Sequence, residues 1–160
     1  MNIFLIGFMG SGKSTLGKKL SDYLNVNFID LDKYIEFNEN YNIKYIFNQK
    51  GEKYFRYIEQ KYLKHKFKEP FIMSVGGGTP CYYNNINYMN QYGITIFINI
   101  NIEFLIYNLL KNSKDDRPLL ISNNKKSLLK DLFINRLFYY KKSKVTINSN
   151  NYININSLLK

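Results

Sequence analysis

The glycine-rich stretch from Gly7 to Ser14 is the segment of the chain most suited to chemistry, and it reads Gly-Phe-Met-Gly-Ser-Gly-Lys-Ser. It matches the pattern G-x-x-x-x-G-K-[ST], whose consecutive backbone N–H groups wrap a phosphate at the start of a helix. Lys13 would bridge the β- and γ-phosphates, and the Ser14 hydroxyl would ligate Mg²⁺. An apolar strand-like run precedes the motif and a helical pattern follows it. The sequence therefore predicts that the chain binds a nucleoside triphosphate.

Two carboxylates, Asp30 and Asp32, come at the end of the next strand-like run. If the strand continues through them, its alternation puts both on the same side, within reach of the phosphate loop. One could then hold Mg²⁺ through water, while the other accepts a proton from a substrate hydroxyl or orients it. The alternative is a solvated helix N-cap pair ahead of Lys33. Both interpretations stay open on the spacing alone.

A run of three glycines, Gly76-Gly77-Gly78, follows the third strand-like run directly. Glycines there let backbone N–H groups approach a ligand with no Cβ in the way. Of the 23 basic residues only Arg56, Arg117 and Arg136 are arginines, which leaves 20 lysines. A planar guanidinium makes paired hydrogen bonds that an ammonium cannot make. These few arginines therefore indicate positions where such paired hydrogen bonds are needed.

The elements that must position these residues alternate along the chain. Near-continuous apolar runs predict buried strands at residues 2–7, 27–30, 70–75, 94–100 and 144–148. Helical spacing is found at residues 14–24, 33–37, 54–67, 84–92, 103–111 and 128–140. This order predicts a three-layer α/β/α domain with a five-stranded parallel sheet and right-handed crossovers. Ligands of such sheets bind beyond the carboxyl ends of the strands.

The composition fits one ordinary domain over residues 1–160, with 45% hydrophobic and 22% charged residues. The formal net charge of +11 suggests a polyanionic partner when it is taken alone. However, the lysines are dispersed, alanine is absent, and residues with A/T-rich codons are abundant, so codon bias explains much of the excess. A single cysteine excludes a disulfide framework, and no run approaches a membrane span. We expect a cytoplasmic protein with no nucleic-acid or membrane partner.

Taken together, these segments resemble the shikimate kinase family. The matching pieces follow the family's order and span nearly the whole chain. They are Gly10 to Thr15, Phe28 to Asp32, Ile46-Phe47, Gly51-Glu52 with Phe55-Arg56 and Glu59, Gly76 to Gly78, Arg117 to Leu120, and Arg136 with Tyr139-Tyr140. The combination of G-E-x-x-F-R-x-x-E, G-G-G and R-P-L-L is specific to this family. Nucleoside monophosphate kinases and gluconate kinases share the fold but lack this combination.

The resemblance implies an enzyme with the P-loop kinase, nucleoside monophosphate kinase-like, architecture. Its reaction is ATP-dependent phosphorylation of the 3-hydroxyl of shikimate, which gives shikimate 3-phosphate and ADP on the route to chorismate and the aromatic amino acids. Mg²⁺ is the expected cofactor and ATP the co-substrate. The resemblance also implies a substrate-binding segment at about residues 33–61, a lid at about residues 112–124, and a monomer.

The same resemblance assigns roles residue by residue. ATP binding falls to Gly10, Ser11, Gly12, Lys13, Ser14, Thr15 and Arg117. Shikimate binding falls to Asp32, Arg56, Gly77, Gly78 and Arg136, with Glu59 orienting Arg56 from the same helix face. The catalytic residues are Lys13, Asp32 and Arg117, and the metal is held by Ser14 and, through water, Asp30. The chain departs from the family near the adenine, where Leu110, Asn150 and Asn151 replace basic residues.

Other functions fit parts of the sequence. A GTPase is disfavoured because Asn124-Lys125-Lys126-Ser127 has serine where the guanine-binding signature N-K-x-D needs aspartate. A different small-molecule kinase on the same fold is the nearest alternative, and the arginine pattern argues against it. A basic nucleic-acid-dependent NTPase would show salt-sensitive binding. A pseudokinase that only binds is disfavoured because every chemical position is filled.

Overall fold

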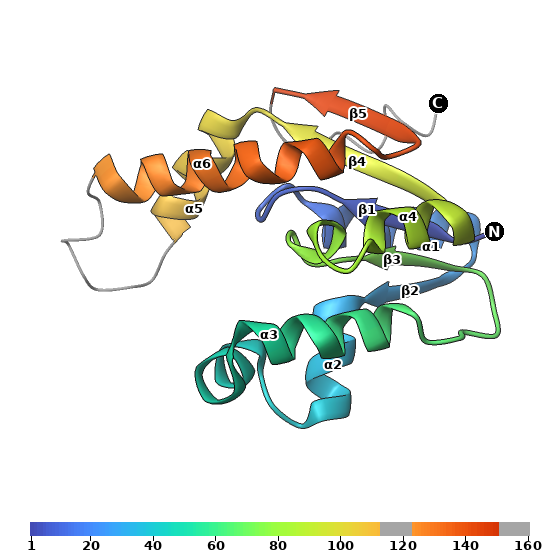
Figure 1. Ribbon diagram of the computed structural model, residues 1–160. Coiled ribbons are helices and arrows are strands. Elements are labelled where there is room, and N and C mark those ends of the chain that lie inside the picture. Colours follow the sequence, from blue (N-terminus) through green and yellow to red (C-terminus); the bar gives the residue numbers. More distant parts are fainter. Residues whose placement is uncertain (113–122, 151–160) are drawn as a thin grey trace.

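A computed structural model describes residues 1–112 and 123–150 of the chain. Its centre is a five-stranded sheet of β1 (Ile3–Ile6), β2 (Asn27–Asp30), β3 (Phe71–Ser74), β4 (Ile94–Ile100) and β5 (Val145–Ser149). All neighbouring strands pair in parallel, in the order β2-β3-β1-β4-β5 (Figure 1). The central strands β1 and β3 are buried along their whole length, while the edge strands β2 and β5 are partly exposed. The apolar runs are therefore explained by burial on both faces of the sheet.

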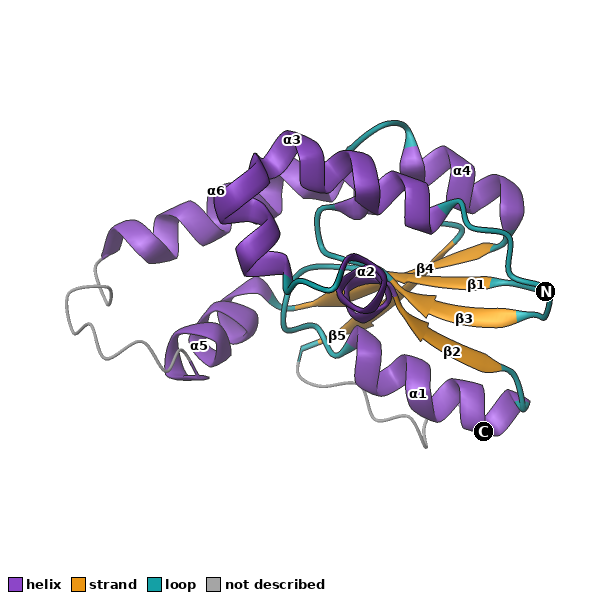
Figure 2. Cartoon of the chain, turned by 90° about the horizontal axis from the view of Figure 1, so that it is seen from below, coloured by secondary structure: helices purple, strands orange, loops and turns teal. Residues whose placement is uncertain are grey.

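Helices cover both faces of this sheet. They are α1 (Lys13–Leu24), α2 (Leu31–Glu39), α3 (Ile43–Leu63), α4 (Asn85–Tyr92), α5 (Ile102–Asn112) and α6 (Asn123–Tyr140), with a short 3₁₀ turn, η1, at Thr79–Cys81. Figure 2 shows α3, α4 and α6 on one side of the sheet and α1 on the other. The predicted three-layer α/β/α fold with five parallel strands is confirmed. Within the described ranges, no helix combines the length and apolar character that crossing a membrane requires.

The register of the sheet brings the important chain segments to one edge. Leu5 and Asp30 both lie opposite Ser74, on β1 and β2 respectively. The three strands therefore end side by side, because neighbouring strands in a parallel sheet run in the same direction. The phosphate loop after β1, the carboxylates after β2 and the glycines after β3 all leave the sheet at this edge. This is the edge at which ligands were predicted to bind.

Helix α3 is longer than the sequence pattern predicted, since it starts at Ile43 rather than residue 54 and ends at Leu63 rather than residue 67. Its first turn is capped by Asn42, whose side chain accepts a hydrogen bond from the backbone N–H of Tyr45 at 2.7 Å. Gly51, with φ 76° and ψ 169°, interrupts the helix and divides it into two parts. A glycine suits this left-handed backbone because it carries no Cβ.

Helix α6 begins at Asn123, five residues before the predicted start at residue 128. The predicted lid at about residues 112–124 therefore overlaps the last residue of α5 and the first two of α6. The part between them, residues 113–122, lies outside the described residues. The prediction of a lid stays a prediction.

Candidate active site

The phosphate loop joins β1 to α1, and its lysine lies over its own backbone. Lys13 Nζ donates hydrogen bonds to the carbonyl oxygens of Gly7 at 2.9 Å and Phe8 at 2.8 Å. Burial lowers the pKa of Lys13 to about 8, and the charges of Asp32 and Asp30 offset part of this effect. Lys13 is thus a buried cation whose present partners are neutral carbonyl groups.

The rest of the loop contains a buried hydroxyl group, that of Ser11, which the fold leaves without a hydrogen bond among the described residues. Gly10 and Gly12 have φ values of 76° and 84°, so the loop turns in the left-handed region on both sides of Ser11. The Ser11 hydroxyl is buried and, within the described part of the chain, has no hydrogen-bond partner. Thr15 is exposed on the first turn of α1. A buried hydroxyl of this kind costs stability unless a ligand satisfies it.

Ser14 lies in a cluster of oxygen atoms from three elements. Its hydroxyl donates to Asp30 Oδ2 at 2.7 Å and lies 3.2 Å from the hydroxyl of Ser74. The pairing of Asp30 with Ser74 across β2 and β3 creates this arrangement. One carboxylate and hydroxyl oxygens are donors that Mg²⁺ accepts when phosphate and water complete its shell. The residues present therefore fit the metal that was predicted at Ser14 and Asp30.

The geometry predicted for Asp30 and Asp32 was wrong in one respect. Strand β2 ends at Asp30, and Leu31 already begins α2, so strand alternation does not orient the pair. Asp30 is the N-cap of α2, and its side chain accepts a hydrogen bond from the backbone N–H of Lys33 at 3.3 Å. The capping interpretation is therefore correct for Asp30, which also accepts from Ser14. Asp32 lies in the first turn of the helix.

Asp32 faces the first glycine of the run after β3. A Cβ added to Gly76 would lie 3.1 Å from Asp32 Oδ1 and 3.0 Å from Glu59 Oε1. Burial raises the pKa of Asp32 to about 6, and the charges of Glu59 and Asp30 add to this rise, whereas that of Lys13 opposes it. A carboxylate with such a pKa changes its protonation near neutral pH, as a proton acceptor in catalysis should.

The other two glycines each lie beside one of the predicted arginines. A Cβ on Gly77 would lie 3.2 Å from a terminal nitrogen of Arg136, and a Cβ on Gly78 would lie 2.6 Å from one of Arg56. Three successive glycines thus contact Asp32, Arg136 and Arg56 in turn. The tertiary structure brings together four of the predicted elements of the site, although they are far apart in the sequence.

Arg56 is held by acidic and aromatic neighbours. Its NH1 group donates to Glu59 Oε2 at 2.9 Å, as the spacing on one helix face predicted. Glu59 is fully buried and also accepts from the Thr79 hydroxyl at 2.6 Å. The ring of Tyr82 covers the guanidinium, with 4.4 Å between its centroid and Cζ. Burial alone would lower the pKa of Arg56, but the charge and hydrogen bond of Glu59 outweigh it and raise this pKa.

Arg136 is half-buried on α6, with its Cζ 5.8 Å from the ring centroid of Phe8 in the phosphate loop. One turn later on the same helix, Tyr140 is fully buried, and its hydroxyl donates to the carbonyl oxygen of Gly77 at 2.6 Å. Tyr140 therefore ties α6 to the glycine run. Arg117, the third predicted arginine, lies outside the described residues.

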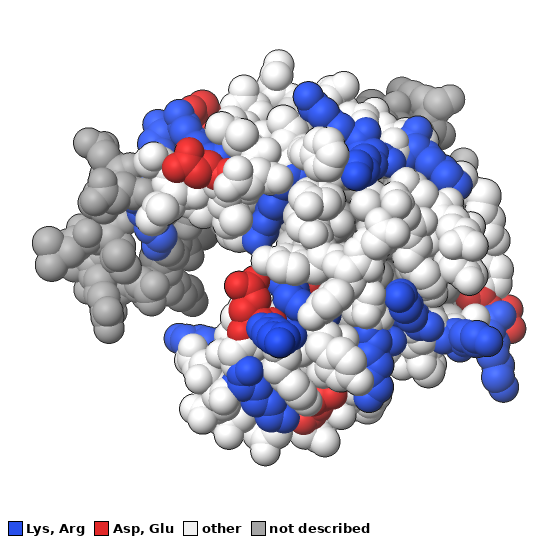
Figure 3. Space-filling view, in the orientation of Figure 1, with Lys and Arg blue, Asp and Glu red and all other residues white. Residues whose placement is uncertain are grey.

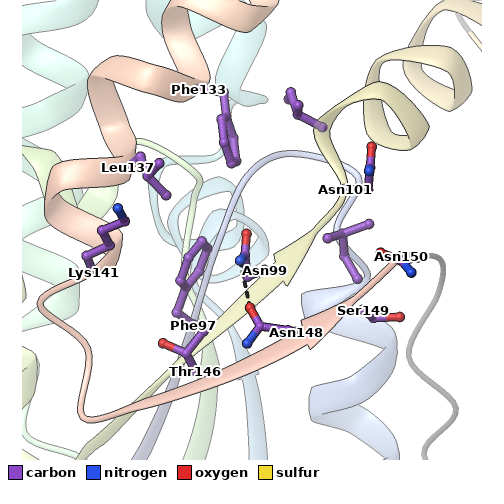
Figure 4. A pocket seen from close by; sticks show the side chains of 12 residues that line it. Phe97, Asn99, Asn101, Phe133, Leu137, Lys141, Thr146, Asn148, Ser149 and Asn150 are labelled. Atoms are coloured by element: carbon purple, nitrogen blue, oxygen red, sulfur yellow. Dashed lines mark hydrogen bonds between the residues drawn. The ribbon is translucent and has the colours of Figure 1, made fainter.

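A cleft of about 830 Å³ lies between α6 and strands β4 and β5, away from this cluster. Figure 4 shows Phe133 and Leu137 from α6, and Lys141 directly after that helix, on the side of the cleft opposite Phe97 and Thr146 of the sheet. Asn99 is bonded to Asn148 at 2.7 Å. The cleft reaches Asn150 at the end of β5. None of the predicted catalytic or shikimate-binding residues lines it, so its size does not mark it as the catalytic site.

Comparisons with known proteins show the family of this chain. The model of the shikimate kinase family matches residues 9–157. The chain belongs to the shikimate kinase family. A shikimate kinase of a Sulfurihydrogenibium species is 42% identical over 149 residues, which cover 92% of this chain and 87% of that relative. The resemblance found in the motifs is therefore confirmed.

Two solved structures of shikimate kinases share the fold of this family member. The enzyme from Bacteroides thetaiotaomicron has a TM-score of 0.83 and 34% identity, and the match covers 98% of this chain and 93% of that one. The enzyme from Acinetobacter baumannii, in complex with shikimate, has a TM-score of 0.81 and 32% identity, with 93% and 83% covered.

Sequence reasoning assigned no role to several residues that hold this shikimate kinase site together. Thr79 bonds Glu59, Tyr82 covers Arg56, and Tyr140 holds Gly77. Thr79 and Tyr82 follow the glycine run closely, which is a usable signal. Tyr140 stands four residues after Arg136, so a shared helix face could have pointed to it.

Proposed function

We propose that this chain transfers the γ-phosphoryl group of ATP to the 3-hydroxyl of shikimate, giving ADP and shikimate 3-phosphate. The observation that carries the proposal is the order of contacts along the glycine run, where Gly76 meets Asp32, Gly77 meets Arg136 and Gly78 meets Arg56. A proton acceptor for a hydroxyl and two cations for a carboxylate are thereby grouped around the backbone of the glycine run. Shikimate, a carbocycle with one carboxylate and three hydroxyls, requires this combination.

In the proposed mechanism, Arg56 and Arg136 hold the carboxylate of shikimate through charge-assisted hydrogen bonds. The backbone N–H groups of Gly77 and Gly78 donate to the substrate. Asp32 accepts a hydrogen bond from the 3-hydroxyl and takes its proton as the oxygen attacks phosphorus. This orientation accounts for most of the proposed rate enhancement, because phosphoryl transfer depends chiefly on positioning and charge neutralisation.

The phosphates of ATP lie on the phosphate loop in this proposal. Lys13 leaves the carbonyl groups of Gly7 and Phe8 and turns to the β- and γ-phosphates, which compensate its buried charge better than neutral oxygens do. Ser14 and, through water, Asp30 would hold Mg²⁺, which would neutralise phosphate charge. Arg117 is proposed to contact the transferring group from the lid.

We further propose that the enzyme works in the cytoplasm as a monomer on two small molecules, without nucleic acid or membrane. The single cysteine and the dispersed lysines support this view. Sedimentation of the purified chain at several concentrations tests the monomer. A molecular mass equal to that of one chain is expected at every concentration.

ADP release with and without shikimate, at several Mg²⁺ concentrations, tests the reaction. ADP should form only when ATP, shikimate and Mg²⁺ are all present. The product should carry phosphate on the 3-oxygen, which ³¹P–¹H correlation in NMR detects. Gluconate and nucleosides serve as control acceptors, and a faster reaction with one of them would contradict the proposed substrate.

A further inference from the structure

Glu52 occupies one edge of the Arg56 guanidinium. Its Oε1 atom accepts hydrogen bonds from Arg56 Nε at 3.2 Å and from NH2 at 3.1 Å. The same oxygen accepts from the Tyr82 hydroxyl at 3.0 Å. Two N–H groups on one edge of the guanidinium converge on a single carboxylate oxygen, which is a charge-assisted contact that a ligand carboxylate could also make. Glu52 thus makes with Arg56 the kind of contact that the proposed function gives to shikimate.

The second arginine of the proposed clamp also acts on Glu52. The pKa of Glu52 is lowered by the hydrogen bond from Tyr82, then by the hydrogen bond and charge of Arg56, and also by the charge of Arg136. Arg56 and Arg136 come from different elements, α3 and α6, and both are close enough to stabilise this one anion. A substrate carboxylate bound by both arginines would interact with the same two charges.

The surroundings of Glu52 differ from those of Glu59, the other acid on Arg56. The side chain of Glu59 is fully buried, whereas that of Glu52 is 53% exposed. A buried acid that also bonds Thr79 is costly to displace, because it would leave an uncompensated charge. An exposed acid can turn into water at small cost, since exposed ion pairs contribute little free energy. Glu59 is therefore the permanent partner of Arg56, and Glu52 is the exchangeable one.

The backbone at Glu52 also allows the exchange. Glu52 directly follows Gly51, where φ is 76° and the helix is interrupted, so it begins the second part of α3. A carboxylate in the first turn of a helix is stabilised by the unpaired backbone N–H groups there. After leaving Arg56, the Glu52 carboxylate would keep this favourable environment.

We propose that Glu52 occupies the substrate-carboxylate position on Arg56 until the carboxylate of shikimate displaces it. This inference rests on the proposed function, because it takes Arg56 and Arg136 as the clamp. The arginines are then never left without an anion. A neutral analogue of shikimate cannot replace the charge of Glu52, so it gains no access to the clamp. Glu52 in this way keeps the clamp paired with an anion at some cost in affinity for shikimate.

Isothermal titration calorimetry of the full chain tests the exchange, with shikimate and its neutral methyl ester as ligands. Glu52→Gln keeps the size of the side chain and removes the competing charge. We expect the Kd for shikimate to fall by about twofold to fivefold, the range for an ion pair with an exposed partner. The Kd for the methyl ester and the KM for ATP should not change. Glu69→Gln is the matched control, because Glu69 is an exposed acid just before the amino end of β3.

A second variant keeps the test independent of any folding defect. Tyr82→Phe retains the ring over Arg56 but removes the hydroxyl that bonds Glu52. It should lower the Kd for shikimate in the same direction and to a smaller extent. If Glu52 only orients Arg56, both variants will instead bind shikimate more weakly, and this result overturns the inference. If the wild-type chain phosphorylates shikimate but the Glu52→Gln variant binds shikimate less tightly, the exchange is refuted and the proposed function stands. A wild-type chain inactive on shikimate refutes the proposed function itself.

Discussion

At Asp32 and Lys13, burial acts on an acid and on a base in the same small space. It raises the pKa of Asp32 to about 6 and lowers that of Lys13 to about 8. In each case the charged form is disfavoured because it has lost hydration. The two shifts bring both groups toward neutral pH, where each can change its charge when the ligands arrive.

Replacement of Asp32 by asparagine should separate chemistry from binding. We expect Asp32→Asn to lower kcat by at least about 10²-fold, the usual effect of removing a proton acceptor. ATP binding should persist. The pKa of Asp32 in the folded protein lies above the ordinary value of 3.8 for an aspartate. The ionised carboxylate therefore costs stability above about pH 6, and this cost disappears as the pH falls toward 4. The variant should therefore have a higher Tm than the wild type at neutral pH. Steady-state kinetics and thermal unfolding give both results, and a near-normal kcat would remove Asp32 from the mechanism.

The same two groups predict the pH dependence of the reaction. Protonation of Asp32 below about pH 6 and loss of the Lys13 proton above about pH 8 should both reduce kcat/KM for ATP at low shikimate, which reflects the free enzyme. The profile should be bell-shaped. In kcat the basic limb should move to higher pH, because bound phosphates stabilise the Lys13 cation. Initial rates in buffers of constant ionic strength measure both profiles, and a flat kcat/KM profile from about pH 5 to about pH 9 would contradict the shifts.

The paired hydrogen bonds of the Arg56 guanidinium should affect the KM for shikimate and not the KM for ATP. Arg56→Lys keeps the charge but loses the paired hydrogen bonds. The KM for shikimate should rise by at least about tenfold, as expected when a charge-assisted paired contact is lost. The KM for ATP should change little. Kinetics with each substrate varied in turn will distinguish the two, and equal changes in both KM values would rule out the carboxylate clamp.

At the scale of elements, the substrate site depends on how α6 meets the turn after β3. Tyr140, fully buried on α6, bonds the carbonyl of Gly77, while Arg136 lies one turn earlier beside the same glycine. One hydrogen bond therefore sets the distance between the helix that carries an arginine and the backbone that contacts the substrate.

Tyr140→Phe tests this connection with the loss of a single oxygen atom. It leaves the carbonyl group of the half-buried Gly77 without its donor, which should lower the free energy of unfolding by about 0.5–1.5 kcal/mol. The KM for shikimate should rise while the KM for ATP stays constant. Tyr139→Phe, on a neighbouring but only half-buried tyrosine, is the matched control. Should Tyr140→Phe lose stability without any change in the KM for shikimate, its hydroxyl has only a structural role.

On the face of the molecule that Figure 3 draws, the charge is distributed rather than concentrated. Figure 3 shows lysine and arginine side chains scattered over one face instead of forming a continuous band. Protein surfaces that bind polynucleotides gather their cations along a stripe or patch. The net charge of +11 is thus consistent with the codon-bias interpretation.

A direct test of this view uses polynucleotides as effectors. Neither DNA nor RNA should raise the rate of ADP release, with or without shikimate. ATP turnover with shikimate should also depend only moderately on salt, unlike polynucleotide binding, which falls steeply as counterions compete. Polynucleotide-stimulated ATP hydrolysis would favour the nucleic-acid-dependent alternative.

The sequence alone determined the fold class, the family and the nature of each functional group. These depend on local features: apolar runs predict buried parallel strands, and a glycine pattern between strand and helix predicts a phosphate loop. Local patterns failed where the chain changes element within a few residues, as at Leu31 and Gly51, because there capping and tertiary packing decide the conformation.

Only the tertiary structure decided how the groups meet. Strand register placed Asp30 against Ser74, and burial among other carboxylates set the pKa of Asp32. Packing of α6 on the glycine run brought Tyr140 to Gly77. Sequence spacing carries no information about such contacts between distant segments, since distances, exposure and local dielectric arise only when the sheet and its helices have assembled.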